Sequence, residues 1–163
     1  MRQILSLFLY LYFSQTLQAQ QEELSVGEVY RVAIRQFIDS HPDMLYNHHD
    51  TVPVLFLKNH SHLTVVGDTL SGVRLVYVSP YEQEKAYEEY FTKRTKVQIL
   101  DIQQMMQWDT VVQVWLLPMS VLYRPGKEMS KLPKYTGEAC EVLYKYTPDR
   151  RHYIYDGKEC RQL

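Results

Sequence analysis

The chain has little cysteine, little net charge and no long apolar run. It holds two cysteines, Cys140 and Cys160, among 163 residues, and its formal net charge is −1 at pH 7. A chain this close to neutral lacks the basic surface on which nucleic acid or anionic lipid would bind. No apolar run reaches the roughly 20 residues that span a bilayer, so we expect no transmembrane segment in residues 20–163.

Recognisable catalytic motifs are also missing from the sequence. It contains no G-x-S-x-G nucleophile motif, no HExxH metal motif and no glycine-rich phosphate loop followed by lysine. Ser61 stands between His60 and His62, but neighbours in sequence do not make a catalytic triad, which is a spatial arrangement. We therefore predict no catalytic residue and no cofactor. An enzyme whose site is assembled from scattered residues stays open as an alternative.

The first nineteen residues have the layout of a secretory signal peptide. Arg2 gives a positive start, Ile4 to Phe13 is an apolar run of about ten residues, and Ala19 precedes a polar stretch. Cleavage after Ala19 would leave residues 20–163 as a single domain in the periplasm or outside the cell. In such an oxidising compartment the two cysteines are expected to form a disulfide, Cys140–Cys160.

Two segments have helix signals. Apolar residues at three- and four-residue spacing predict a helix over 24–40, with Ser25 and Glu28 as a capping box and Pro42 just beyond its end. A second helix is predicted over 80–94, because Ser79 can cap it, acids occupy its first turn and bases its last.

The remaining segments are typical of strands. Pro53 places the run 52–57 at a sheet edge or makes it begin there. A change in alternation predicts a bulge between Ile99 and Leu100. Further strands are expected at 63–66, 73–78, 111–123, 139–146 and 152–156. The last two flank the turn 147–150 and would bring Cys140 opposite Cys160, with Gly157 able to absorb a shift of register.

This order of elements predicts an α+β fold, in which two helices pack on a curved antiparallel sheet. The order resembles that of cystatin-like and NTF2-like cones. The segments SPYEQEKAYEEYF and CEVLYKYTPDRRHYIYDGKEC also resemble small uncharacterised exported proteins of Gram-negative bacteria. That resemblance implies export and carries over no activity, ligand or site residue.

Histidine is the one chemically capable side chain that is locally enriched. Five of the six histidines fall between residues 41 and 62. His60 and His62 would share a face if they lay on a strand, and His48 and His49 could approach from the preceding loop. Imidazole suits zinc or copper, so these four residues are candidate metal ligands. The alternative is a set of solvated loop histidines.

The tyrosine-rich hairpin is a second candidate surface. Tyr144 and Tyr146 lie on one strand and Tyr153 and Tyr155 on the other, near several basic residues. Exposed tyrosine and arginine are typical of binding hot spots, whereas paired tyrosines across strands simply stabilise a sheet. We predict an exported non-catalytic module that binds an unknown protein or small ligand, or is structural. The alternatives are a histidine-centred metal-binding or small-pocket protein, and an enzyme.

Overall fold

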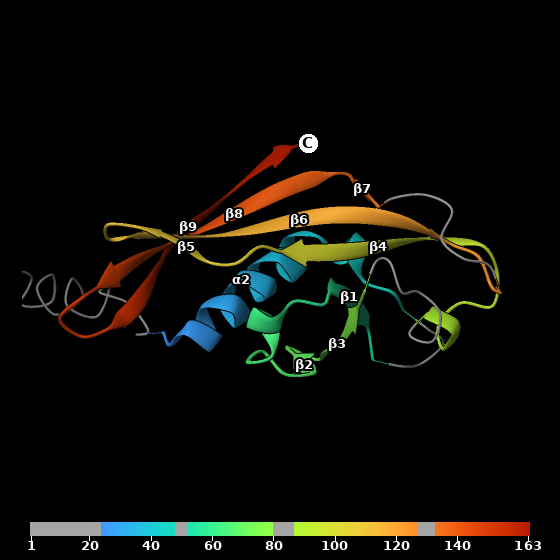
Figure 1. Ribbon diagram of the computed structural model, residues 1–163, viewed down its shortest axis with the longest axis horizontal. Helices are drawn as coiled ribbons and strands as arrows, with labels where there is room; N and C mark the ends of the chain where they lie inside the picture. Colours follow the sequence, from blue (N-terminus) through green and yellow to red (C-terminus); the bar gives the residue numbers. More distant parts are fainter. Residues whose placement is uncertain (1–23, 48–51, 80–86, 127–132) are drawn as a thin grey trace, which may run out of the picture.

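The protein is described by a computed structural model over residues 24–47, 52–79, 87–126 and 133–163. These residues form a nine-stranded sheet with one long helix against it (Figure 1). In chain order the elements are α2 (Val26–Ser40), the 3-10 helix η1 (Pro42–Met44), β1 (Val54–Lys58), the 3-10 helix η2 (Ser61–Leu63), β2 (Thr69–Leu70), β3 (Val73–Val78), β4 (Thr95–Ile102), β5 (Met106–Trp108), β6 (Val111–Tyr123), β7 (Lys134–Tyr135), β8 (Glu138–Thr147) and β9 (His152–Gln162).

The sheet is mixed, and this corrects the predicted fold class. Its order is β2-β3-β1-β4-β6-β8-β9, with β5 and β7 also paired to β6, and β1 runs parallel to both β3 and β4. The described chain is mostly β with one long helix, so an α+β fold with two helices on an antiparallel sheet is wrong. Parallel strands need a crossover connection, and here residues 59–72 lead from β1 to β3 and residues 79–94 lead from β3 to β4. Apolar spacing in the sequence does not reveal which strands become neighbours.

The predicted helix over 80–94 lies partly outside the described residues, and it ends earlier than predicted. Residues 80–86 lie outside the described residues, and of the remainder only Tyr87 and Glu88 are helical before the chain turns towards β4. The side chain of Tyr87 is fully buried, with its ring centroid 5.5 Å from that of Phe56. Aromatic packing therefore anchors the described end of this segment against β1.

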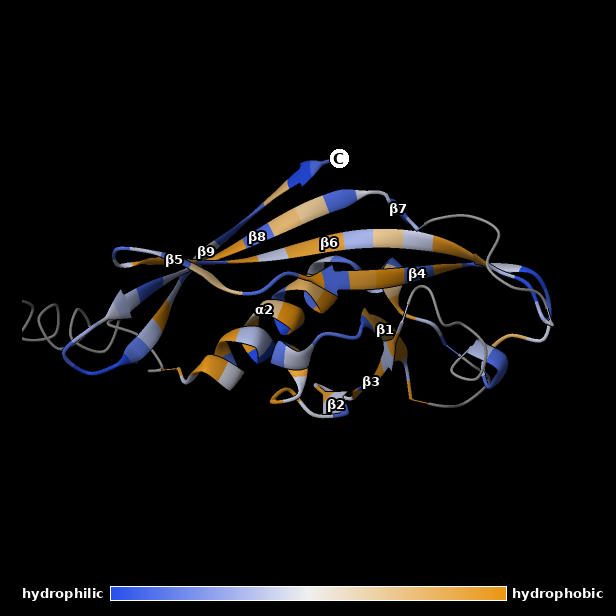
Figure 2. Cartoon of the chain, in the orientation of Figure 1, coloured by the Kyte–Doolittle hydropathy of each residue, from blue (hydrophilic) through white to orange (hydrophobic). Residues whose placement is uncertain are grey.

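Helix α2 is confirmed, with the predicted capping box and the predicted end at Ser40, although it begins at Val26 and not at residue 24. The backbone N–H of Ser25 donates to the Glu28 carboxylate at 2.7 Å, and the helix stops at Ser40 before Pro42. Its buried side is made by Val29, Tyr30, Ala33, Ile34, Phe37 and Ile38. The orange stretches of α2, β1, β4 and β6 in Figure 2 are the apolar residues that the fold brings together. Among the described residues, no helix is long and apolar enough to cross a membrane.

Strand β4 is buried on both faces. Leu100 and Ile102 belong to the core that lies beneath α2, whereas Val97 and Ile99 belong to a second core that includes Phe56. The register of β4 with β6 is continuous, so the predicted bulge is wrong. A strand with two buried faces loses the apolar–polar alternation from which the bulge was inferred.

The C-terminal hairpin has the predicted pairing. Cys140 lies directly opposite Cys160, and the two sulfur atoms form a disulfide. A register shift occurs where Leu143 pairs with Gly157, so the bulge absorbs the offset of the turn. Leu24, just before α2, forms an isolated antiparallel bridge with Tyr153, which joins the start of the helix to the last strand.

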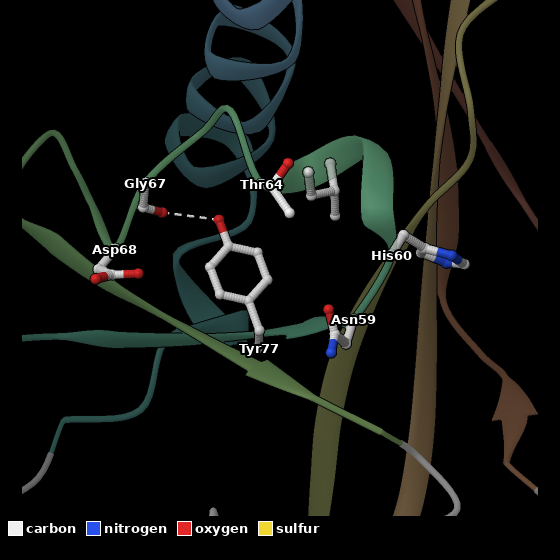
Figure 3. A pocket seen from close by; sticks show the side chains of 7 residues that line it. Asn59, His60, Thr64, Gly67, Asp68 and Tyr77 are labelled. Carbon is white, nitrogen blue, oxygen red and sulfur yellow. Dashed lines mark hydrogen bonds between the residues drawn. The ribbon is translucent and has the colours of Figure 1, made fainter.

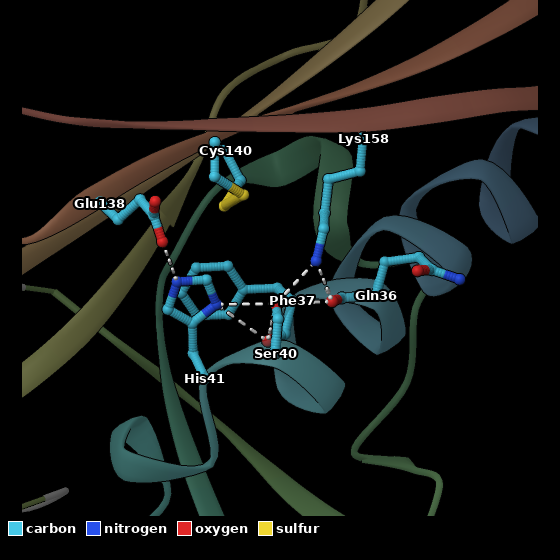
Figure 4. Close-up of polar contacts among 8 residues, drawn as sticks. Gln36, Phe37, Ser40, His41, Glu138, Cys140 and Lys158 are labelled. Carbon is cyan, nitrogen blue, oxygen red and sulfur yellow. Dashed lines mark hydrogen bonds and ion pairs between the residues drawn. A yellow bond between two sulfur atoms is a disulfide. The ribbon is translucent and has the colours of Figure 1, made fainter.

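The C-terminal end of α2 is attached to this hairpin by polar contacts (Figure 4). The ammonium of Lys158 donates to the Gln36 carbonyl at 2.9 Å and to the Ser40 hydroxyl at 2.7 Å. His41 lies 3.3 Å from the Glu138 carboxylate. A cation at a helix C-terminus interacts favourably with the helix dipole and with unpaired carbonyls. The helix is thereby fixed against β8 and β9.

Candidate functional site

The candidate site lies at the carboxyl ends of β1 and β4. The two strands are parallel, so Lys58 at the end of β1 and Asp101 near the end of β4 come to the same edge of the sheet. Ligands commonly bind at the carboxyl ends of parallel strands, because loops that leave these ends project side chains there. Here the loop after β1 contributes His60 and His62.

Asp101 is the centre of this site. Its side chain has no exposed surface and accepts hydrogen bonds from three side chains: Lys58 Nζ at 2.8 Å, His60 Nε2 at 2.7 Å and the Tyr135 hydroxyl at 2.9 Å. Burial raises the pKa of Asp101, but these hydrogen bonds and the charge of Lys58 outweigh burial, and the net pKa is lowered. The carboxylate is therefore held in its charged form.

The negative charge of Asp101 is balanced within the network, and some of its partners are partly exposed to solvent. Asp101 is the one buried charged residue in the described core, and the Lys58 ammonium neutralises it. A buried carboxylate without such a partner would cost several kcal/mol. The side chains of Lys58 and His60 keep 20% and 27% of their surface exposed. The network thus connects a buried charge to the molecular surface at His60.

His60 and His62 are brought together, although neither lies on a strand. Residues 63–66 are not a strand: η2 occupies Ser61–Leu63 and a turn follows. Leu63 and Val66 are both fully buried in the core that includes α2. They are three residues apart, so they face the core from a helical turn and not from a strand. The two imidazole rings still stack, with centroids 5.0 Å apart.

His62 is held by the backbone of β4. Its Nε2 lies 3.0 Å from the carbonyl oxygen of Ile102, and burial lowers its pKa. His48 and His49, the other two predicted ligands, lie outside the described residues. Across the described part of the chain, no three His, Cys, Asp or Glu side chains are grouped as metal ligands. The four-residue metal site stays a prediction.

A pocket opens beside His60, between η2 and β3 (Figure 3). Its volume is about 270 Å³, and it is lined by Asn59, His60, Leu63, Thr64, Gly67, Asp68 and Tyr77. The Tyr77 hydroxyl donates to the Gly67 carbonyl at 2.7 Å, and the Arg31 guanidinium donates to the Val66 carbonyl. In Figure 3 the His60 ring is directed away from Tyr77. The pocket wall is thus fixed by side chains from β3 and α2.

The tyrosines of the C-terminal hairpin contact one another across the strands. The rings of Tyr146 and Tyr153 lie 5.1 Å apart and those of Tyr144 and Tyr155 lie 6.0 Å apart. Tyr144 is fully buried and donates a hydrogen bond to the Val29 carbonyl. This arrangement is the sheet-stabilising one, and it leaves Tyr144 unable to act as a surface contact.

Sequence reasoning missed the acid at the centre of the site. The available signal was a single carboxylate inside the apolar run 97–102, a position that is costly unless the charge is paired. Lys58 and Tyr135 carried no comparable signal, because their contact with Asp101 depends on strand order.

Comparison with known proteins identifies no relative of the chain. No protein family, no curated protein and no solved structure matches it. Function is therefore inferred from the geometry of the site.

Proposed function

We propose that this chain is an exported binding protein, and that a small polar molecule binds in the pocket between η2 and β3. The observation that carries this proposal is the fixed pocket wall. Tyr77 and Arg31 hold the carbonyls of Gly67 and Val66, so the wall is ordered before a ligand arrives. A preorganised site loses less entropy on binding than one that must fold around its ligand.

The lining side chains favour a ligand that donates hydrogen bonds or carries positive charge. Asp68 supplies a carboxylate and Asn59 an amide, while Leu63 and the Tyr77 ring supply apolar surface. Ligand pockets commonly combine such a surface with a few polar groups, in volumes of roughly 300–1,000 Å³. The volume of about 270 Å³ lies just below this range, so the pocket fits a small molecule.

The contacts of the pocket side chains favour ligand binding over catalysis. The Thr64 hydroxyl donates to the Ser61 carbonyl, and the His60 ring bonds to Asp101. A hydroxyl nucleophile needs a general base within hydrogen-bond reach. Neither contact pairs the Thr64 hydroxyl with a base.

Export is supported by the N-terminal pattern and by the disulfide. Residues 1–19 have the charged, apolar and small-residue sections of a signal peptide. The Cys140–Cys160 disulfide is compatible with an oxidising compartment, the periplasm or the cell exterior. Mass spectrometry of the product from its native host tests the address: a chain that begins at Gln20 is expected, and one that retains Met1 would contradict export.

Ligand binding can be tested by nuclear magnetic resonance on residues 20–163. We expect small cationic or donor-rich molecules to shift backbone amides in the segment 59–77, and anionic molecules of equal size to have no effect. Asp68→Asn should weaken that binding at least fivefold. Asp109→Asn, in the turn between β5 and β6, is the matched control and should leave it unchanged. Shifts that map elsewhere, or no response to either class, would contradict the proposal.

A further inference from the structure

We infer that His60 and His62 together bind one divalent transition-metal ion through their Nδ1 atoms. His60 also lines the proposed ligand pocket, but its ring is directed away from Tyr77 (Figure 3). Imidazole nitrogen is a preferred ligand of zinc and copper ions. An ion can bind only through a ring nitrogen that makes no hydrogen bond to the protein.

The Nε2 atoms of both rings are occupied by acceptors on β4. The Ile102 carbonyl can only accept, so the Nε2 of His62 must donate to it. The Asp101 carboxylate accepts from the Nε2 of His60 in the same way. In a neutral imidazole one nitrogen carries the proton and the other a lone pair. Both rings are thus fixed as the tautomer whose lone pair is on Nδ1.

This arrangement is the one found around metal-binding histidines. Such a histidine usually donates its second ring nitrogen to a carboxylate or a backbone carbonyl, which fixes the ring and makes the ligating nitrogen more basic. Here His60 has the carboxylate and His62 the carbonyl, from the consecutive residues Asp101 and Ile102. Two histidines in a solvated loop would bond mainly to water, and their Nε2 atoms would not both be held by acceptors of the protein.

The two rings are also close enough to share an ion. Zinc and copper lie about 2.1 Å from an imidazole nitrogen, so two ligating atoms can be at most about 4.2 Å apart. The ring centroids lie 5.0 Å apart, so one ion between the two rings is within reach of a ligating nitrogen from each. Asp101 is already used by Lys58, His60 and Tyr135, so it supports the ligands without being one.

Two ligands leave coordination positions for water or for a further group. We therefore expect an exchangeable ion, with Cu²⁺ bound more tightly than Zn²⁺, in line with the general order of affinities for these ions. The experiment is titration calorimetry of residues 20–163 with CuCl₂ and with ZnCl₂. One ion per chain is expected for each metal.

Four variants locate the site. His60→Gln with His62→Gln should abolish binding, whereas His48→Gln with His49→Gln should change the affinity less than threefold. His152→Gln, on β9, is the single-residue control and should be silent. Asp101→Asn should weaken binding 10- to 100-fold without abolishing it, as expected of a group that orients a ligand. Absence of binding by the unaltered protein, or loss only in the His48/His49 variant, would overturn the inference.

A measurement without substitution covers the case in which a variant fails to fold. In long-range ¹H–¹⁵N spectra of the unaltered protein, ZnCl₂ should move the Nδ1 resonances of His60 and His62 and leave their Nε2 resonances protonated. Movement of the Nε2 resonances instead would assign the metal to the other side of the rings and overturn the inference.

Discussion

The Nζ atom of Lys58 lies 2.8 Å from Oδ2 of Asp101, a carboxylate with no exposed surface, and this pair joins the ends of two parallel strands. Removing one partner of a buried ion pair leaves the other uncompensated, at a cost of about 3–5 kcal/mol. The cost is smaller when the remaining charge can reach water, as the partly exposed Lys58 can.

Asp101→Asn is therefore expected to lower the free energy of unfolding by about 3 kcal/mol, the low end of the range for broken buried pairs. Urea denaturation at pH 7 measures this change. Asp109→Asn is the matched control and should stay within about 0.5 kcal/mol of the unaltered protein. An equally small effect of both substitutions would show that the pair does not contribute to stability.

Acid should remove the advantage that Asp101 provides. Its pKa is lower in the folded chain than in the unfolded chain, so its contribution is complete above the unfolded carboxyl value of about 4 and disappears as the pH falls through the folded value. The difference in unfolding free energy between the unaltered protein and Asp101→Asn should therefore shrink from pH 6 to pH 2. A difference that stays constant or grows on acidification would contradict the assignment.

The disulfide should contribute about 3 kcal/mol, because it closes a loop whose ends are 20 residues apart. The double substitution Cys140→Ala, Cys160→Ala is expected to lower the free energy of unfolding by this amount in guanidinium denaturation. Dithiothreitol added to the unaltered protein should produce the same loss and leave the variant unaffected. A reductant effect on the variant would mean that the loss does not come from this bond.

Lys158→Met should loosen the C-terminal end of α2. The ammonium is lost from the carbonyl of Gln36 and the hydroxyl of Ser40, and a loss of about 1 kcal/mol is expected. Lys145→Met removes a lysine from the same hairpin that is paired with Asp156 in an exposed position, so its effect should be smaller than the error of the measurement. Amide exchange of residues 37–41 should accelerate in the Lys158 variant alone.

Tyr144→Phe removes the donor to the buried Val29 carbonyl. The hydrogen bond is 2.8 Å long and fully enclosed, so the unpaired carbonyl should cost about 1–3 kcal/mol. Tyr146→Phe, two residues further along β8, is only partly buried and should be nearly neutral. Urea denaturation of both variants decides the matter, and equal losses would contradict a specific role for the Tyr144 hydroxyl.

Local signals in the sequence were sufficient for α2 and for the C-terminal hairpin. Ser25 and Glu28 form the capping box, and Pro42 stops the helix, because these effects act within a few residues. The hairpin register followed from a turn, two cysteines and a glycine that accommodates the bulge. In each case the determining contacts are short in sequence.

The strand order and the site could not be derived in the same way. Pro53 is compatible with an edge strand or a strand start, and β1 proves to begin just after it in the interior of the sheet. Asp101 meets Lys58 only because β1 and β4 are parallel neighbours. His60 and His62 were identified as a pair, but the carboxylate and carbonyl that orient them come from about 40 residues away.

The bridge between Leu24 and Tyr153 constrains the order in which the chain can assemble. Leu24, just before α2, pairs with a strand that is made almost last, since a chain is synthesised from its N-terminus. Until β9 has been synthesised, the apolar side of α2 is not covered by that strand. The loop between Leu24 and Tyr153 is long, and its closure is slow because it costs conformational entropy. Completion of the native fold must therefore follow, and cannot accompany, synthesis of most of the polypeptide.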